Sequence, residues 1–109
     1  MNREERLARN EVLFREVNER IEEMRSGEDG EIEFLCECGL ETCTAVIKLS
    51  TNEYEKLRSD PTTFAVAPGH EIEDIEAVVS ESDHFNVVRK HESESEIARR
   101  MDPRSPDSR

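Results

Sequence analysis

The sequence predicts an α+β fold, in which a long N-terminal helix packs on short antiparallel hairpins that carry a zinc-knuckle-like site. Residues 3–25 contain no Gly or Pro and repeat their apolar side chains at helical spacing. All three cysteines lie within residues 36–43, where one metal ion can bind them together. Four later segments either alternate apolar with polar residues or are rich in β-branched residues, as strands are: 32–36, 45–49, 75–79 and 85–90.

The composition indicates one domain with a modest core. The chain has 109 residues, of which 34% are hydrophobic and 39% charged, and its aromatic residues are 4 Phe and 1 Tyr. Such a core is thin, so we expect a metal ion or a partner to help hold it together.

The net charge of −12 is concentrated in two segments. Residues 28–41 and residues 71–83 each carry six acidic residues and no Lys or Arg. Binding to nucleic acid needs local positive charge, so this distribution argues against it. An acidic surface suits a basic protein partner, or it serves only to keep the protein soluble.

The cysteine count and the N-terminal residues favour a cytoplasmic location. The first six residues are too charged for a signal peptide, and no apolar run is long enough to cross a membrane. Three cysteines fit a disulfide framework poorly, because their number is odd. In a reducing compartment, clustered cysteines bind metal more often than they pair with each other.

The predicted helix over residues 3–25 has an apolar seam. Leu7, Phe14 and Ile21 recur every seven residues, and Asn10, Val17 and Met24 occupy the alternate spacing, with Leu13 widening the seam. The seam lies either on the protein's own sheet or against a second helix in a dimer. Asn10 suits a register-setting polar contact in such a dimer, or it marks an exposed end.

Two hairpins and a short helix are expected to follow. Residues 26–30 end the first helix in a Gly-containing loop, and the strands over 32–36 and 45–49 form a hairpin with the cysteines at its tip. Ser50 and Glu53 form a capping box for a helix that stops at Asp60, because Pro61 disfavours helical geometry in the residue before it.

The second half of the chain is expected to hold another hairpin. A short apolar segment at 64–67 is followed by Pro68 and Gly69, and residues 75–79 and 85–90 form the hairpin. The tail is expected to be weakly helical over 92–101 and disordered over 102–109. The predicted organisation is therefore an N-terminal amphipathic helix, a small zinc-binding domain and a tail: 1–26, 27–91 and 92–109.

The cysteine cluster predicts a structural Zn²⁺ site. Zinc prefers four N or S ligands in a tetrahedron, and Cys36, Cys38 and Cys43 supply three. The Cys-x-Cys-Gly turn lets Gly39 take the positive φ that a tight turn requires. We expect His70 as the fourth ligand, because Pro68-Gly69 turns the chain immediately before it. His84 and His91 are the alternatives for this position.

Other interpretations of the cysteines remain open at this point. They can be free thiols, since the usual zinc knuckle has two residues between its cysteines and this one has a single residue. A redox pair at Cys36 and Cys38 is a further alternative, although Glu37 and Glu41 provide the opposite of the cationic setting that lowers a thiol pKa. A catalytic metal is disfavoured, because three thiolates weaken its Lewis acidity.

Three motifs resemble a set of small, mostly uncharacterised bacterial proteins. They are the Asn-Glu-x-Leu-Phe-Arg-Glu-Val-Asn-Glu-Arg-Ile helix at 10–21, the Cys-Glu-Cys-Gly knuckle with a third cysteine at 36–43, and the Phe-x-Val-x-Pro-Gly-His segment at 64–70. The resemblance covers roughly residues 6–90 and implies that the three cysteines and His70 form one unit. It implies no activity.

Together these features predict a non-enzymatic, zinc-stabilised protein-interaction or regulatory module. Its partner is either another protein or a second copy of the chain bound through the N-terminal helix. The alternative is a cysteine-based redox sensor or a small metal-dependent enzyme.

Overall fold

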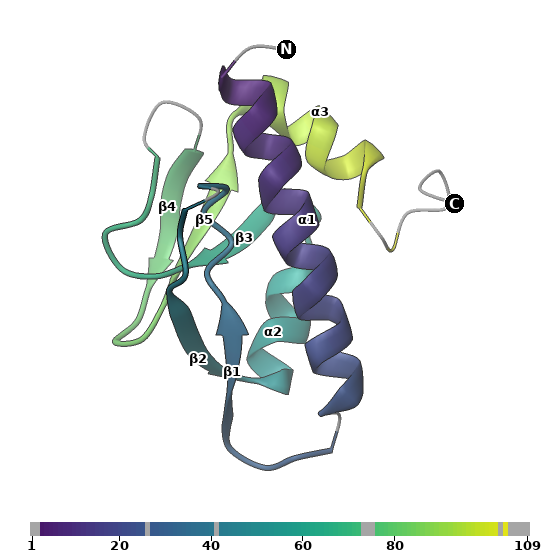
Figure 1. Cartoon of the computed structure of the whole chain (residues 1–109), viewed down its shortest axis with the longest axis vertical. Coiled ribbons are helices and arrows are strands. Elements are labelled where there is room, and N and C mark those ends of the chain that lie inside the picture. The colour runs from purple at the N-terminus through teal and green to yellow at the C-terminus, as the bar shows by residue number, and fades with distance from the viewer. Residues whose placement is uncertain (1–2, 26, 41, 73–75, 103, 105–109) are drawn as a thin grey trace.

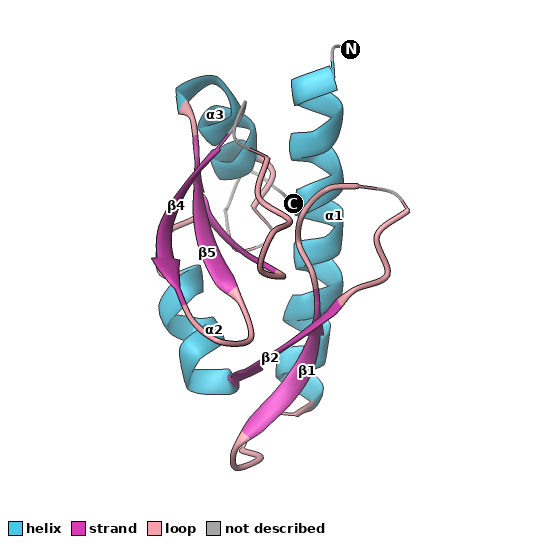
Figure 2. Cartoon of the chain, turned by 90° about the vertical axis from the view of Figure 1, so that its left-hand side faces the viewer, coloured by secondary structure: helices cyan, strands magenta, loops and turns pink. Residues whose placement is uncertain are grey.

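The structure of the protein is a computed structural model, which describes residues 3–25, 27–40, 42–72, 76–102 and 104. Both sheets lie on one side of the long N-terminal helix (Figures 1 and 2). The predicted α+β class, with a long helix and small antiparallel sheets, is confirmed. The elements in chain order are α1 (Arg3–Met24), β1 (Glu31–Leu35), β2 (Val46–Ser50), α2 (Thr51–Arg58), β3 (Thr63–Val66), β4 (Glu76–Glu81), β5 (Asn86–Lys90) and α3 (Glu92–Arg100).

Helix α1 packs on β1 and on α3, but its buried face differs from the predicted seam. Leu7 is buried and Ile21 packs against the core, whereas Val17 and Met24 are 44% and 83% exposed. The face that packs inward includes three fully buried polar side chains, those of Glu11, Arg15 and Asn18. The predicted seam is therefore wrong at Val17 and Met24. The reason is that the elements facing α1 present backbone polar groups, which polar side chains must satisfy.

The first hairpin forms as predicted, with β1 and β2 antiparallel in the register that pairs Phe34 with Ile47. Its inward positions are fully or almost fully buried, and the ring of Phe34 stacks on that of Tyr54 from α2 with 4.6 Å between centroids. This stacking joins the hairpin to the helix that follows it. The position of β1 fixes where Cys36 begins the turn.

The capping box that begins α2 is confirmed. The backbone N–H of Glu53 donates to Ser50 Oγ at 3.0 Å, and its carboxylate accepts from the Ser50 backbone N–H at 2.8 Å. The helix ends at Arg58, close to the predicted stop before Pro61. Strand β3 follows at once and is buried along its whole length.

The second sheet has the strand order β3-β5-β4, with both pairs antiparallel. Strands β4 and β5 form the predicted second hairpin, and an irregularity between Val78 and Ser80 shifts their register. Phe64, Ala65 and Val66 of β3 join Val88 of β5 in the core that α1, α2, α3 and the first hairpin also enter. The core thus lies between the two sheets and the helices.

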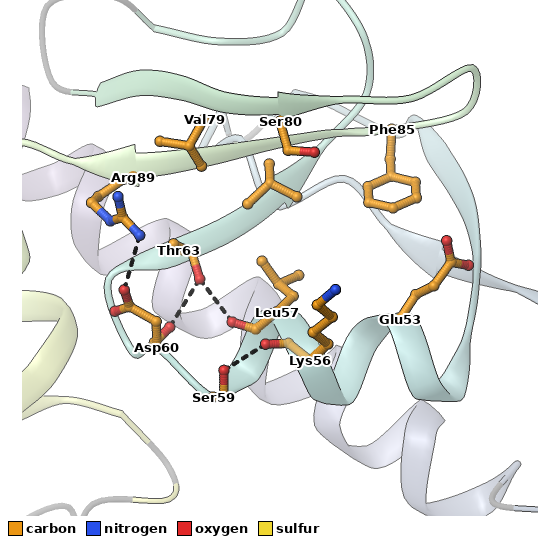
Figure 3. A pocket seen from close by; sticks show the side chains of 11 residues that line it. Glu53, Lys56, Leu57, Ser59, Asp60, Thr63, Val79, Ser80, Phe85 and Arg89 are labelled. Atoms are coloured by element: carbon orange, nitrogen blue, oxygen red, sulfur yellow. Dashed lines mark hydrogen bonds and ion pairs between the residues drawn. The ribbon is translucent and has the colours of Figure 1, made fainter.

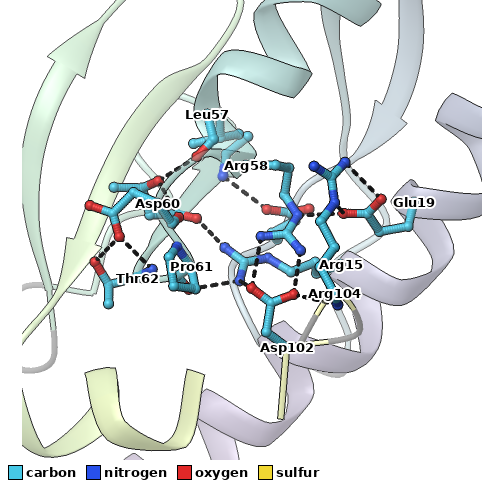
Figure 4. A network of polar contacts seen from close by, with 12 residues as sticks. Arg15, Glu19, Leu57, Arg58, Asp60, Pro61, Thr62, Asp102 and Arg104 are labelled. Atoms are coloured by element: carbon cyan, nitrogen blue, oxygen red, sulfur yellow. Dashed lines mark hydrogen bonds and ion pairs between the residues drawn. The ribbon is translucent and has the colours of Figure 1, made fainter. Parts of the chain in front are cut away.

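Two residues after α3, Asp102 and Arg104, lie against residues of α1 and α2 (Figure 4). Asp102 is 5% exposed, and its carboxylate accepts hydrogen bonds from Arg58 of α2. Arg104 forms ion pairs with Glu19 of α1 and Glu55 of α2. The expectation of disorder is wrong for these two residues, because charges on α1 and α2 offer them partners that no local pattern shows. Residues 103 and 105–109 lie outside the described residues, as do Ser26, Glu41 and Ile75 of other predicted segments.

Candidate metal centre

Four side chains with metal-binding atoms meet at the tip of the first hairpin. The ligand atoms of Cys36, Cys38, Cys43 and His70 all lie within 4.8 Å of one another. His70 Nδ1 is 3.6 Å from the sulfur of Cys36 and 3.5 Å from the sulfur of Cys43. Cys36 and Cys38 are buried, whereas Cys43 and His70 are half-buried. The structure brings together all four residues that the sequence named, and this group can hold a metal ion.

The turn that carries the cysteines begins where β1 ends. The backbone N–H of Cys36 donates to the carbonyl of Ala45 at 3.0 Å, one step beyond the last paired residues of the two strands. The Cys43 N–H donates to the carbonyl of Leu40 at 3.0 Å. Gly39 between them has φ of 83°, a conformation that glycine adopts at little steric cost. The predicted role of Gly39 in the turn is confirmed.

The same glycine lies directly against α1. A Cβ at Gly39 would stand 2.6 Å from the carbonyl oxygen of Leu7 and 2.8 Å from Cγ of Glu11. Asn10 adds a polar contact, because its side-chain amide donates to the Gly39 carbonyl at 3.0 Å. Asn10 thus contacts the protein's own turn, and neither role predicted for it, a dimer contact or an exposed end, describes it. The contact fixes the turn on the helix.

The segment after β3 brings in the histidine. The His70 backbone N–H donates to the carbonyl of Ala67 at 2.9 Å, which closes the Pro68-Gly69 turn. The N–H of Ala67 in turn donates to the Cys36 sulfur at 3.1 Å. Strand β3 therefore leads into a segment that both supports one thiol and positions the imidazole. A metal ion bound here would join the first hairpin to the second sheet.

Glu37, between the first two cysteines, is fully buried and anchors the turn from inside. One of its carboxylate oxygens accepts from the Tyr54 hydroxyl and from the Asn18 amide, each at 2.9 Å. The other accepts from the Ala65 N–H at 3.0 Å, and the Glu37 N–H donates to the Ala65 carbonyl at 2.8 Å. Because the side chain is held by α1, α2 and β3, the two cysteines beside it are held as well.

The hydrogen bond between Cys36 and Cys38 shifts the pKa values of these two thiols in opposite directions. A hydrogen bond from Cys36 lowers the pKa of Cys38 to about 5, and a backbone N–H bond from Leu40 acts in the same direction. The bond with Cys38, together with burial, raises the pKa of Cys36. Burial also raises the pKa of Cys43. These shifts favour the thiolate of Cys38 over those of Cys36 and Cys43, and a bound cation would favour all three thiolates.

A second buried polar cluster lies behind the turn, and no sequence pattern predicted it. Lys90 of β5 pairs with both Glu11 of α1 and Glu76 of β4, and all three side chains have no exposed surface. The second oxygen of Glu76 accepts from the Ile72 N–H at 3.0 Å. Burial raises the pKa of Glu11 well above its ordinary value, against the effect of Lys90. Two carboxylates thus share one lysine within the core.

The two alternative histidines are not in the cluster. His84 is exposed in the turn between β4 and β5, and His91 is exposed at the N-cap of α3. The supporting residues Asn18, Glu37 and Tyr54 could not be singled out from the sequence, since acidic and amide residues are common throughout the chain. Only the position of Glu37 between two cysteines was a local signal.

A groove elsewhere on the molecule is a second candidate for a functional site. It lies between α2 and the strands β4 and β5, has a volume of about 420 Å³ and has an apolar floor that includes Leu57 and Phe85 (Figure 3). An exposed ion pair between Asp60 and Arg89, at 3.3 Å, lies at its rim. Cysteine and histidine are absent from the residues that line the groove. The cluster of three cysteines and His70 is the stronger candidate.

Comparison of the chain with models of protein families, with curated proteins and with solved structures found no significant match. Among the described residues, no helix combines the length and the apolar character that crossing a membrane requires.

Proposed function

We propose that this protein is a non-enzymatic interaction or regulatory module whose fold is stabilised by one Zn²⁺ ion. The observation that carries the proposal is the convergence of three thiols and one imidazole from two separate segments. Clusters of this composition, Cys₃His, are characteristic of structural zinc sites.

Two distances within the cluster support the proposal of zinc. With Zn–S bonds of about 2.3 Å and Zn–N bonds of about 2.0 Å, a tetrahedral site separates a sulfur from a nitrogen by about 3.5 Å. The two separations between His70 Nδ1 and the sulfurs of Cys36 and Cys43 are 3.6 and 3.5 Å. The cysteines and His70 would hold the ion, and its chemistry there would be to bind the two halves of the fold to each other.

The surroundings favour a structural over a catalytic metal. Four protein ligands fill a tetrahedral zinc ion, whereas catalytic sites keep a position open for water. Both oxygens of the adjacent Glu37 carboxylate accept hydrogen bonds within the core, which favours a structural role for it over that of a base. Another acidic residue beside the cluster is Glu71, which directly follows His70. Its carboxylate accepts a hydrogen bond from the Gly69 backbone N–H at 3.1 Å.

The partner is proposed to be a protein, either another chain or a second copy, that binds the outer face of α1. Leu13, Val17 and Met24 of α1 are large apolar side chains with at least 44% of their surface exposed. The resemblance to small bacterial proteins supports a place in a bacterial cytoplasm as part of the same proposal.

The metal is tested by measuring zinc in protein purified without added metal. We expect about one zinc per chain in the wild type and a loss of most of it in His70→Ala. The matched control is His84→Ala, because His84 is exposed and outside the cluster. Equal zinc in the two variants would contradict the assigned ligand, and a zinc-free, folded wild type would contradict the site itself.

One observation favours a second function, that of a thiol-based redox sensor. The lowered pKa of Cys38, which its hydrogen bond with Cys36 causes, resembles the condition of reactive thiols. Against it, Cys38 has no exposed surface. Rapid modification of one cysteine by a thiol reagent in metal-free, folded protein would favour this alternative.

A further inference from the structure

The outward face of α1 carries a stripe of four exposed side chains, Leu13, Val17, Arg20 and Met24. Leu13 is 55% exposed, Val17 44% and Met24 83%, and Arg20 between them is exposed as well. At 100° per residue, these positions fall within an arc of about 60° on the helix. The apolar members point away from the core that the opposite face of α1 covers.

The spacing of this α1 stripe is the same in both directions. The intervals along the chain are four, three and four residues. An antiparallel copy of the helix, related by a twofold axis midway between Val17 and Arg20, therefore places Leu13 opposite Met24 and Val17 opposite Arg20. Such a contact is isologous, since each surface meets its own image. Helical stripes commonly have such spacing, so it permits this contact, and the charges beside the stripe must favour it as well.

The flanking residues are compatible with the same arrangement. In the antiparallel register, the guanidinium of Arg20 reaches Glu16 of the second copy, and the twofold axis repeats the pair. The aliphatic stem of Arg20 covers Val17 of the other chain while its charge stays at the edge. On the opposite edge, half-buried Phe14 and Ile21 come into proximity across the two chains. Apolar residues thus meet apolar residues, and Arg meets Glu.

We infer that the α1 stripe is a self-association surface, and that its occupant is a second copy of this chain in antiparallel orientation. This inference deepens the interaction role proposed above and rests on it. Three apolar side chains per chain make a small interface, below the roughly 1,200 Å² of stable complexes, so the dimer is expected to be weak. A dissociation constant of about 10–500 µM is appropriate to such a contact.

Sedimentation over a range of concentrations tests the surface. The zinc-loaded wild type is expected to show reversible dimerisation, and Val17→Glu is expected to weaken it by about tenfold or more, because it introduces charge at the centre. Met24→Glu, at the most exposed position, serves as a second variant if Val17→Glu fails to fold. The matched control is Val46→Glu on β2, where the valine is 54% exposed and outside the stripe. A wild type that is monomeric at about millimolar concentration, or a Val46→Glu effect equal to that of Val17→Glu, would overturn the inference.

A charge-exchange experiment tests the register. Glu16→Arg puts two arginines on and beside the stripe, and Arg20→Glu puts two glutamates there. Each variant alone is expected to lose self-association, whereas an equimolar mixture is expected to recover it as a heterodimer. No recovery would exclude the antiparallel register. The zinc content of every variant is measured in parallel, so that a lost metal site and a lost dimer are recognised separately.

Discussion

Gly39 is the residue at which the turn with the three cysteines and the long helix meet. It combines a positive φ of 83° with a Cβ position only 2.6 Å from the Leu7 carbonyl oxygen. The positive φ is unfavourable for any residue with a side chain. The close contact adds a second cost, because a Cβ would collide with the backbone of α1, which cannot move aside as a side chain can.

We expect Gly39→Ala to lower the free energy of unfolding by about 2–4 kcal/mol, the sum of the conformational and overpacking costs. Gly30→Ala is the control, since Gly30 has φ of 80° and a Cβ there would have nothing within 4 Å. Its cost should be only about 1–2 kcal/mol. Urea unfolding of both variants at saturating zinc measures the difference, and equal values would show that the contact with α1 is unimportant.

Glu11 is a buried carboxyl whose charge the fold opposes. Burial raises its pKa well above the ordinary value of 4.5, and repulsion by Glu76 adds to the effect, while Lys90 acts against it. One of its oxygens has no hydrogen-bond partner among the described residues. A protonated Glu11 would leave Lys90 and Glu76 as a simple ion pair.

The pH dependence of stability follows from this raised pKa. The folded state holds the proton more tightly than the unfolded chain, so the free energy of unfolding falls as the pH rises above 4.5. We expect Glu11→Gln, which has no proton to lose, to lose less stability than the wild type between about pH 5 and about pH 8. Thermal unfolding at constant zinc saturation measures this. Parallel curves for the two proteins would mean that Glu11 is ionised in the fold.

At the scale of elements, the turn between β1 and β2 is held by the helices and by β3 through Glu37. Replacing its carboxylate by an amide presents an N–H₂ group to donors that need an acceptor. We expect Glu37→Gln to cost about 1–3 kcal/mol and to weaken zinc binding, since the adjacent cysteines lose their support. Glu33→Gln, an exposed position on β1, is the control. An unchanged zinc affinity in Glu37→Gln would show that the turn is rigid without it.

The strands of the two hairpins, the capping box and the turn with three cysteines could be predicted because their signals are local. Ser50 and Glu53 are three residues apart, and Cys36, Cys38 and Cys43 lie within one turn. The buried face of α1 could not be predicted in this way. Arg15 is buried because it donates to the carbonyl of Pro61, at 2.7 Å, and to that of Thr63, and these groups arrive only through tertiary folding. The spacing of hydrophobic residues along the sequence carries no information about such tertiary hydrogen bonds.

At the scale of the whole molecule, a cation–carboxylate network joins the segment after α3 to α1 and α2 (Figure 4). Asp102 receives two hydrogen bonds from Arg58 and lies 3.8 Å from Arg15, and neither arginine side chain is exposed. Burial opposes the charge of Asp102, but the bonds from Arg58 outweigh it and keep its pKa below the ordinary value.

We expect Asp102→Asn to lower the free energy of unfolding by about 3 kcal/mol, because it leaves buried arginine charge without its counterion. The loss should shrink at acidic pH, where the wild-type carboxyl is protonated too. Asp83→Asn, at an exposed position, should have little effect. Chemical denaturation of the two variants makes the comparison, and a neutral Asp102→Asn would show that Glu19 alone suffices for Arg58.

The polar inner face of α1 has a consequence for the order in which the protein is made. The helix leaves the ribosome before the segments on which it packs, and the groups that Arg15 contacts, from Pro61 to Asp102, are synthesised long afterwards. Until then its charged and amide side chains can remain hydrated. The nascent helix therefore exposes less hydrophobic surface to chaperones and neighbouring chains than a helix with a wholly apolar inner face would. The same residues that make the finished core specific thus keep the unfinished chain soluble.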